Sequence, residues 1–123
     1  MRAMVIDDSR AMRMILKRMI GKLDFEATEA ADGQQALDLL ETMPEVPDLA
    51  LIDWNMPVMN GLEFVTRVRA DPRLRTMVLV MVSTESEHSQ IVRALAAGAH
   101  EYVIKPFTED DIAQKFEMLG LTK

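Results

Sequence analysis

The chain has 123 residues, a formal net charge of −6 at pH 7 and no cysteine. This length predicts a single domain over residues 1–123 without an output domain. The absence of cysteine excludes disulfides, thiolate metal sites and thiol nucleophiles. The acidic balance argues against a nucleic-acid partner. No apolar run approaches the roughly 20 residues that a membrane helix needs, so we expect no membrane partner and a cytoplasmic location.

Short apolar runs alternate with helical patterns along the whole chain. We predict strands over residues 4–6, 25–30, 49–52, 77–82 and 102–104. Each run is followed by a helical pattern, which begins near Ser9, Asp32, Gly61, Ser86 or Thr108. Ser86 is predicted to cap the fourth helix. One buried face is predicted on the first helix, formed by Met12, Ile15, Leu16, Met19 and Ile20. Such alternation implies parallel pairing through right-handed crossovers, and so an α/β, flavodoxin-like three-layer sandwich. The second strand, which carries Glu26 and Glu29, is predicted to lie at the edge of the sheet.

Polar residues follow four of the predicted strands. Asp7 and Asp8 follow the first, Asp53 the third, Ser83 the fourth and Lys105 the fifth. In a parallel sheet these strand ends share one edge, where ligands bind, so we expect the side chains to converge. Carboxylate oxygens without histidine or cysteine favour Mg²⁺ over zinc.

This set of side chains is suited to phosphoryl transfer onto a carboxylate. Asp53 would be the nucleophile, Lys105 would contact a phosphoryl oxygen, and the Ser83 hydroxyl would donate to another. Each residue alone also has a structural explanation. Asp7 and Asp8 would favour the positive end of the first helix, Asp53 would be a turn residue, Ser83 a cap and Lys105 a surface lysine.

Four sequence motifs give the chain a resemblance to a known family. They occupy residues 5–9 (Val-Ile-Asp-Asp-Ser), 53–57 (Asp-Trp-Asn-Met-Pro), 60–61 (Asn-Gly) and 102–107 (Tyr-Val-Ile-Lys-Pro-Phe). In this order, and with an apolar strand ending at Ser83, they resemble the receiver domain of bacterial two-component response regulators. The resemblance spans residues 4–119. It implies a five-stranded parallel sheet of order 2-1-3-4-5 between five helices, the CheY-like fold.

The resemblance implies a role for each residue of the set. Asp53 would be the phosphoacceptor. Asp8 and Asp53 would bind Mg²⁺ directly, Asp7 would bind it through water, and the backbone carbonyl of Asn55 would complete the protein ligands. Lys105 would bind the phosphoryl group.

The resemblance also implies a switch. Ser83 would move toward the phosphoryl group, and Tyr102 would turn inward as Ser83 vacates space. Asn55 and Glu85 would tune how fast the phosphoryl group hydrolyses. The Lys105–Pro106 peptide bond is expected to be cis.

By this resemblance the chain is a response regulator phosphorylated on Asp53 by a histidine kinase or phosphotransfer domain. Its motifs are most similar to those of the CheY-like single-domain chemotaxis regulators. Phosphorylation would change a protein-binding surface near the fourth helix, fifth strand and fifth helix, with the flagellar motor switch as the candidate target. We expect a monomer, and no enzyme, because the chain would catalyse only its own phosphorylation and dephosphorylation.

Other functions share part of this pattern. A single-domain phosphorelay intermediate or phosphate sink would have the same site residues and differ only in partners. A Mg²⁺-dependent aspartyl phosphohydrolase would need an acid two residues after the nucleophile, where this chain has Asn55. A nucleotide- or flavin-binding module would need a glycine-rich loop where Asp7 and Asp8 stand. A DNA-binding regulator would need an additional domain.

The remaining charged residues receive surface interpretations. The first helix is predicted to form a docking surface for the kinase or phosphotransfer domain. Its residues are Met12, Met14 and the arginines Arg10, Arg13 and Arg18, together with Lys17. His88 and His100 are predicted to be exposed and to have no metal role. A second basic group is predicted to be a solvated face: Arg67, Arg69, Arg73 and Arg75.

Overall fold

The computed structural model describes residues 1–121 and contains one parallel sheet of five strands. The strands are β1 (Arg2–Ile6), β2 (Glu26–Ala30), β3 (Leu49–Ile52), β4 (Val78–Ser83) and β5 (Glu101–Ile104). Their order is β2-β1-β3-β4-β5, which confirms the predicted topology. The burial of β2 alternates along the strand, whereas β3 is buried throughout. This pattern confirms that the second strand is an edge strand.

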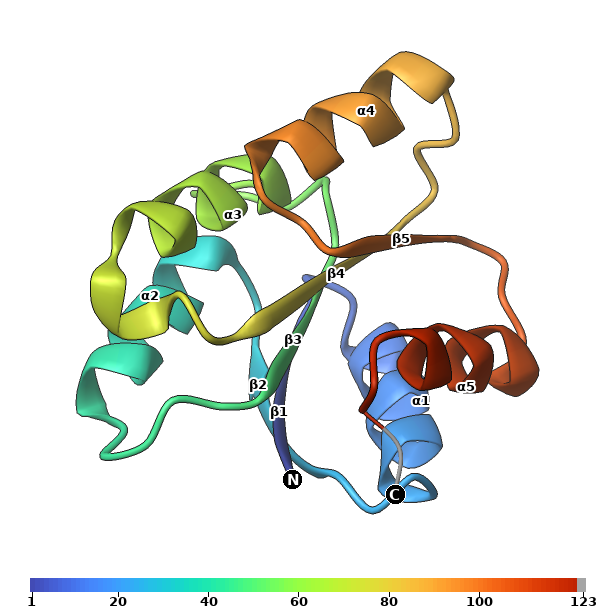
Figure 1. Ribbon diagram of the computed structural model, residues 1–123, viewed down its shortest axis with the longest axis horizontal. Coiled ribbons are helices and arrows are strands. Elements are labelled where there is room, and N and C mark those ends of the chain that lie inside the picture. The colour runs from blue at the N-terminus through green and yellow to red at the C-terminus, as the bar shows by residue number, and fades with distance from the viewer. Residues whose placement is uncertain (122–123) are drawn as a thin grey trace.

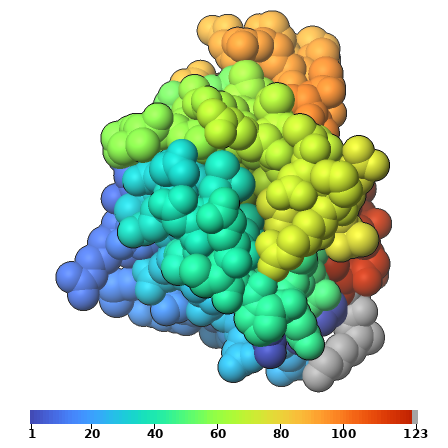
Figure 2. All heavy atoms as spheres, turned by 90° about the vertical axis from the view of Figure 1, so that its left-hand side faces the viewer, coloured from blue at the N-terminus to red at the C-terminus, as the bar shows by residue number. Residues whose placement is uncertain are grey.

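Helices cover both faces of the sheet (Figure 1). They are α1 (Arg10–Gly21), α2 (Gly33–Thr42), α3 (Gly61–Ala70), α4 (His88–Ala97) and α5 (Glu109–Met118), with a 3₁₀ turn η1 (Pro72–Leu74) after α3. Helices α1 and α5 lie on one face, and α2, α3 and α4 lie on the other. Figure 2 looks onto the second face, where α2 and α3 are packed side by side and α4 stands at the top. No helix within residues 1–121 is long and apolar enough to cross a membrane.

Two apolar cores lie on opposite sides of the sheet. One packs Phe64 and Leu40 of the helices on the α2–α4 side against alternate residues of the strands. The other packs Leu16 and Phe116, from α1 and α5, against the remaining strand residues. Because both faces of the central strands are covered, these strands read as continuous apolar runs in the sequence. On α1, however, Ile15 is 39% exposed although it falls on the predicted apolar face.

Four of the helices have an N-cap side chain that accepts a hydrogen bond from the backbone N–H three residues later. These N-caps are Ser9 for α1, Asp32 for α2, Asn60 for α3 and Thr108 for α5. Helix α4 differs, because it begins after Glu87 and has no such bond. The predicted cap at Ser86 is therefore wrong. The helix starts one residue later than expected, so the Ser86 hydroxyl is too far from the first turn to cap it.

The basic group on α3 and η1 is not simply a solvated face. Arg69 Nε donates to the carbonyl oxygen of Gly98 at 2.9 Å, and its Nη2 donates to that of Met77 at 3.1 Å. Arg73 Nη1 donates to the carbonyl oxygen of Leu40 at the end of α2, at 2.9 Å. These two arginines therefore join elements on the α2–α4 side, which corrects the prediction for both.

The two histidines differ in their contacts. His88 is exposed, as predicted. His100 is also exposed as a residue, but its Nδ1 accepts from the Leu79 N–H at 3.0 Å and lies 3.0 Å from Arg69 Nη2. Burial, and then the charge of Arg69, lower the pKa of His100. The neutral ring is thus part of the packing around the β4–β5 end of the sheet.

Gly61 packs so closely against the backbone of Asp53 that no side chain fits there. Its N–H donates to the carbonyl oxygen of Trp54 at 2.9 Å, and a Cβ at this position would collide with the carbonyl oxygen of Asp53. We therefore expect Gly61→Ala to reduce the free energy of unfolding by about 1–3 kcal/mol in urea titrations.

The matched control for this prediction is Gly21→Ala, at the end of α1. A Cβ there meets no atom within 4 Å, so this change should be neutral or slightly stabilising. Equal losses in the two variants would show that Gly61 is not under special steric constraint.

Candidate functional site

The site lies at the carboxyl ends of the strands. Asp7 directly follows β1, Asp53 follows β3, Ser83 ends β4 and Lys105 follows β5. The ladder continues past the strand ends, because Asp53 N–H donates to the carbonyl oxygen of Ile6 at 2.9 Å and Lys105 N–H to that of Ser83 at 2.8 Å. Backbone pairing therefore fixes the origin of each side chain, as the sequence predicted.

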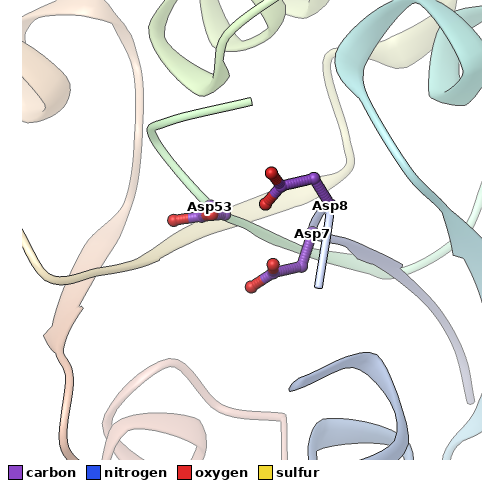
Figure 3. Close-up of side chains that lie close together, drawn as sticks. All are labelled: Asp7, Asp8 and Asp53. Atoms are coloured by element: carbon purple, nitrogen blue, oxygen red, sulfur yellow. The ribbon is translucent and has the colours of Figure 1, made fainter. Parts of the chain in front are cut away.

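Three carboxylates converge at this edge (Figure 3). One oxygen of each of Asp7, Asp8 and Asp53 lies within 4.8 Å of the others. Asp7 is 2% exposed and Asp53 is 8% exposed, whereas Asp8 is exposed. The set thus has two buried carboxylates and one at the surface, the arrangement of an open site at the end of the sheet.

Lys105 is the cation of the site. Its Nζ lies 2.9 Å from Asp7 Oδ2 and 3.5 Å from Asp53 Oδ1. Since β5 is separated from β3 by β4, the lysine side chain extends past the end of β4 to reach both carboxylates. The Lys105–Pro106 bond is cis, which confirms that prediction.

The pKa of Asp53 reflects the negative charge of the neighbouring carboxylates. Burial, and then the charge of Asp7, raise the pKa of Asp53 to about 6, although Lys105 acts in the opposite direction. One ammonium therefore does not offset the desolvation of Asp53 and its repulsion by Asp7. Oxygen donors with excess negative charge fit a hard divalent cation such as Mg²⁺.

Glu85 links the predicted tuning and switch residues. Its side chain accepts from Asn55 Nδ2 at 3.0 Å, its N–H donates to Ser83 Oγ at 3.1 Å, and its carbonyl oxygen accepts from the Tyr102 hydroxyl at 2.7 Å. Ser83 is fully buried and Tyr102 is 6% exposed. The tyrosine ring is therefore already turned inward in this structure, and Asn55, Ser83, Glu85 and Tyr102 form one hydrogen-bonded network.

Arg13 belongs to the site rather than to the surface. Its Nη1 donates to the carbonyl oxygen of Asp7 at 2.7 Å, and its Nε pairs with Glu29 Oε1 at 3.0 Å. Lys17 Nζ pairs with the other oxygen of Glu29, also at 3.0 Å. The docking interpretation of Arg13 and Lys17 is thus weakened, because both cations are already engaged. The sequence gives no signal of the contact with Asp7, because Asp7 precedes α1 and Arg13 bonds to its backbone carbonyl.

Comparison with known proteins agrees with this geometry. The sequence pattern of the response regulator receiver domain matches residues 3–117. The chain belongs to this family. The receiver domain is 42% identical over 118 residues to a chemotaxis protein CheY homolog of Campylobacter jejuni, covering 95% of this chain and 90% of that protein. It is 38% identical over 120 residues to chemotaxis protein CheY1 of Helicobacter pylori, covering 97% of this chain and 96% of that protein.

Solved structures support the same fold. The structure of the chemotaxis response regulator CheY4 of Vibrio cholerae superposes on the receiver domain with a TM-score of 0.87. The two share 28% sequence identity over 96% of this chain and 97% of the other. The fold and the family are therefore shown together, across nearly the whole chain.

The raised pKa of Asp53 predicts how the receiver domain responds to losing this carboxylate. The folded-state pKa, about 6, lies above the ordinary value of 3.8, so ionised Asp53 lowers stability above pH 6, and this cost disappears below pH 3.8. Asp53→Asn should therefore raise the free energy of unfolding of the metal-free protein at pH 7 by about 1–2 kcal/mol.

This gain should shrink as the pH falls from 6 toward 3.8, because Asp53 in the parent becomes protonated. Urea titrations in EDTA at several pH values measure it. Asp38→Asn, on the exposed face of α2, is the control and should change stability little at any pH. A loss of stability in Asp53→Asn at pH 7 would contradict the repulsion argument.

Proposed function

We propose that the receiver domain is a response regulator that accepts a phosphoryl group on Asp53 from a histidine kinase or phosphotransfer domain. The observation that supports this most strongly is the position of Lys105 Nζ, between Asp7 and Asp53 at 2.9 Å and 3.5 Å. A buried carboxylate beside an ammonium, with a third carboxylate within 4.8 Å, is suited to phosphoryl transfer onto an acid.

In the proposed reaction, an Asp53 oxygen attacks the phosphorus of a phosphohistidine. The new P–O bond forms as the P–N bond breaks, and the electron pair of that bond stays on the imidazole nitrogen. Lys105 would stabilise charge on the phosphoryl oxygens, because its ammonium already lies within ion-pair distance of the nucleophile. With its pKa raised to about 6, Asp53 is mostly ionised at pH 7 and thus competent as a nucleophile.

Mg²⁺ is the proposed cofactor. Asp8 and Asp53 would hold it directly, the backbone carbonyl of Asn55 would be a third ligand, and Asp7 would contact it through water. When bound, the ion would neutralise these carboxylates and the oxygens of the incoming phosphoryl group. Asp7 would also continue to accept the hydrogen bond from Lys105.

Phosphorylation would act through the network around Glu85. The Ser83 hydroxyl would move to donate to the phosphoryl group, and this movement would disturb the bond that Ser83 Oγ accepts from the Glu85 N–H at 3.1 Å. Because the Tyr102 hydroxyl bonds to the carbonyl of the same residue at 2.7 Å, a shift of Glu85 would reach both β5 and the segment before α4. The phosphorylated form would thus favour one state of the α4–β5–α5 surface.

Chemotaxis is the proposed pathway, and a downstream protein such as the flagellar motor switch is the proposed target. Its support is the set of CheY-named relatives, which match over at least 90% of their own length at 38–42% identity. A phosphorelay intermediate or phosphate sink is the alternative, because it would use the same residues with other partners. In either role the receiver domain would act as a monomer and would turn over no external substrate.

Phosphorylation by acetyl phosphate tests the chemistry directly. Incubation with Mg²⁺ should add a single phosphoryl group, detected by rapid intact-mass analysis. The adduct should be absent in EDTA and in Asp53→Asn, because the first removes the cation and the second removes the nucleophile. Asp38→Asn, which leaves the site intact, should be phosphorylated like the parent.

An adduct that persists in Asp53→Asn would place the acceptor elsewhere. If the wild type gives no adduct with acetyl phosphate or with a phosphorylated histidine kinase, the proposed function is wrong, and the chain is a binding module with the receiver fold.

The face of α1 that remains available for kinase docking carries Arg10, Met14 and Arg18. All three are exposed, Met14 at 54%, and they are spaced four residues apart on one side of the helix. Charge reversal at both arginines should slow phosphotransfer from a chemotaxis histidine kinase by about tenfold or more, through lost electrostatic steering.

Acetyl phosphate should still phosphorylate this double variant at the parental rate, because the small donor needs no docking surface. Arg75→Glu, beyond η1, is the matched control and should leave both rates unchanged. Unaltered transfer from the kinase in the double variant would remove this face from the docking site.

A further inference from the structure

The Arg13 side chain connects the edge strand with the backbone of the acidic pair. It is only 16% exposed and donates from two different nitrogens, Nη1 to the Asp7 carbonyl oxygen at 2.7 Å and Nε to Glu29 Oε1 at 3.0 Å. Lys17 holds the second oxygen of Glu29 at 3.0 Å. The two hydrogen bonds to Glu29 lower its pKa, so the carboxylate stays ionised and holds Arg13 in place.

Every polar atom of Asp7 is engaged. Its N–H donates to the carbonyl oxygen of Ala30 at 3.1 Å, its Oδ1 accepts from the Ser9 N–H at 2.9 Å, and its Oδ2 pairs with Lys105. Arg13 supplies the fourth contact, to the carbonyl oxygen. Because the peptide unit is planar, fixing this carbonyl also fixes the plane that leads to the Cα of the next residue.

The next residue is Asp8, which has no comparable restraint of its own. Asp8 is exposed, and across residues 1–121 its carboxylate makes no hydrogen bond or ion pair with another side chain. Repulsion from Asp7 and Asp53 favours rotation of this carboxylate away into solvent. The Asp7–Asp8 peptide sets the position from which the Asp8 side chain starts, and so whether its carboxylate can reach the other two, from which it lies within 4.8 Å.

We propose that Arg13, held by Glu29, is a positioning residue that orients Asp8 for cation binding. The inference rests on the proposed Mg²⁺ site but assigns a task to a side chain outside the ligand set. Arg13 does not touch the cation. It acts through the Asp7 carbonyl, so its loss should weaken Mg²⁺ binding without removing a ligand.

Positioning and simple charge predict effects of opposite sign. A guanidinium near an acidic site repels a divalent cation, so removing its charge should by itself strengthen Mg²⁺ binding. Losing the hold on the Asp7 carbonyl should weaken binding. Lys17 provides the matched control, because it shares Glu29 with Arg13 yet makes no contact with Asp7.

The experiment is a Mg²⁺ titration followed by the fluorescence of Trp54 and repeated by calorimetry. Trp54 is the sole tryptophan, directly follows Asp53 and is 8% exposed, so its emission should respond to a cation at the site. Arg13→Met should raise the Mg²⁺ dissociation constant about tenfold, as losing an orienting group does in other metal sites. Lys17→Met should leave the constant unchanged or lower it.

A second readout separates positioning from a direct chemical role. At saturating Mg²⁺, Arg13→Met should be phosphorylated by acetyl phosphate at close to the parental rate, because the ligands and Lys105 remain. A rate that stays low under saturation would place Arg13 in the chemical step and overturn the positioning role. So would a dissociation constant that is unchanged or lower in Arg13→Met, or one that rises equally in Lys17→Met.

Arg13→Lys keeps the proposal testable if Arg13→Met fails to fold by circular dichroism. Lysine keeps the charge, but one ammonium does not reproduce the fork that reaches both Glu29 and the Asp7 carbonyl. It should therefore bind Mg²⁺ more weakly than the parent, and equal binding would overturn the proposal. If the parent itself binds no Mg²⁺, the proposed function fails before this inference is tested.

Discussion

The repulsion among Asp7, Asp8 and Asp53 is the constraint on which the rest of the site depends. Carboxyl ends of parallel strands meet at one edge, so the fold brings these groups together whether or not a cation is present. Lys105 compensates part of the charge by extending from β5 past β4 to Asp7 and Asp53. The pKa of Asp53 nevertheless remains raised to about 6. In the metal-free domain, the repulsion among these carboxylates lowers stability, and a bound cation would relieve it.

The same cost explains why stability and function oppose each other here. A carboxylate destabilised by burial and like charge gains more from Mg²⁺ than a solvated one, since the ion removes a repulsion that folding has already imposed. Asp53, the proposed acceptor, is held by backbone pairing, through its N–H and the Ile6 carbonyl at 2.9 Å, and by the absence of a side chain at Gly61. The backbone therefore keeps the three carboxylates close together, although their repulsion would otherwise move them apart.

Strand ends were predictable from the sequence, whereas the reach of long side chains was not. Buried parallel strands give continuous apolar runs, and the residue after each run lies at the shared edge, so Asp53 and Lys105 could be placed before any coordinates. Arg13 and Arg69 each bond to backbone carbonyls, and a carbonyl leaves no signal in a sequence. The start of α4 was misplaced at Ser86, because no side-chain cap marks it.

Helix α4, part of the output surface proposed above, has fewer buried residues than any other α-helix within residues 1–121. Ala94 is its one fully buried residue among those the structure describes, and its first turn lacks a side-chain cap. Arg93, an exposed residue of α4, lies over the ring of Trp54 with its Cζ 5.9 Å from the ring centroid, a contact of small energy. A helix held this lightly needs only a small free-energy difference to change position. Glu85 forms hydrogen bonds with both Ser83 and Tyr102, and it lies in the short segment between the end of β4 and the start of α4.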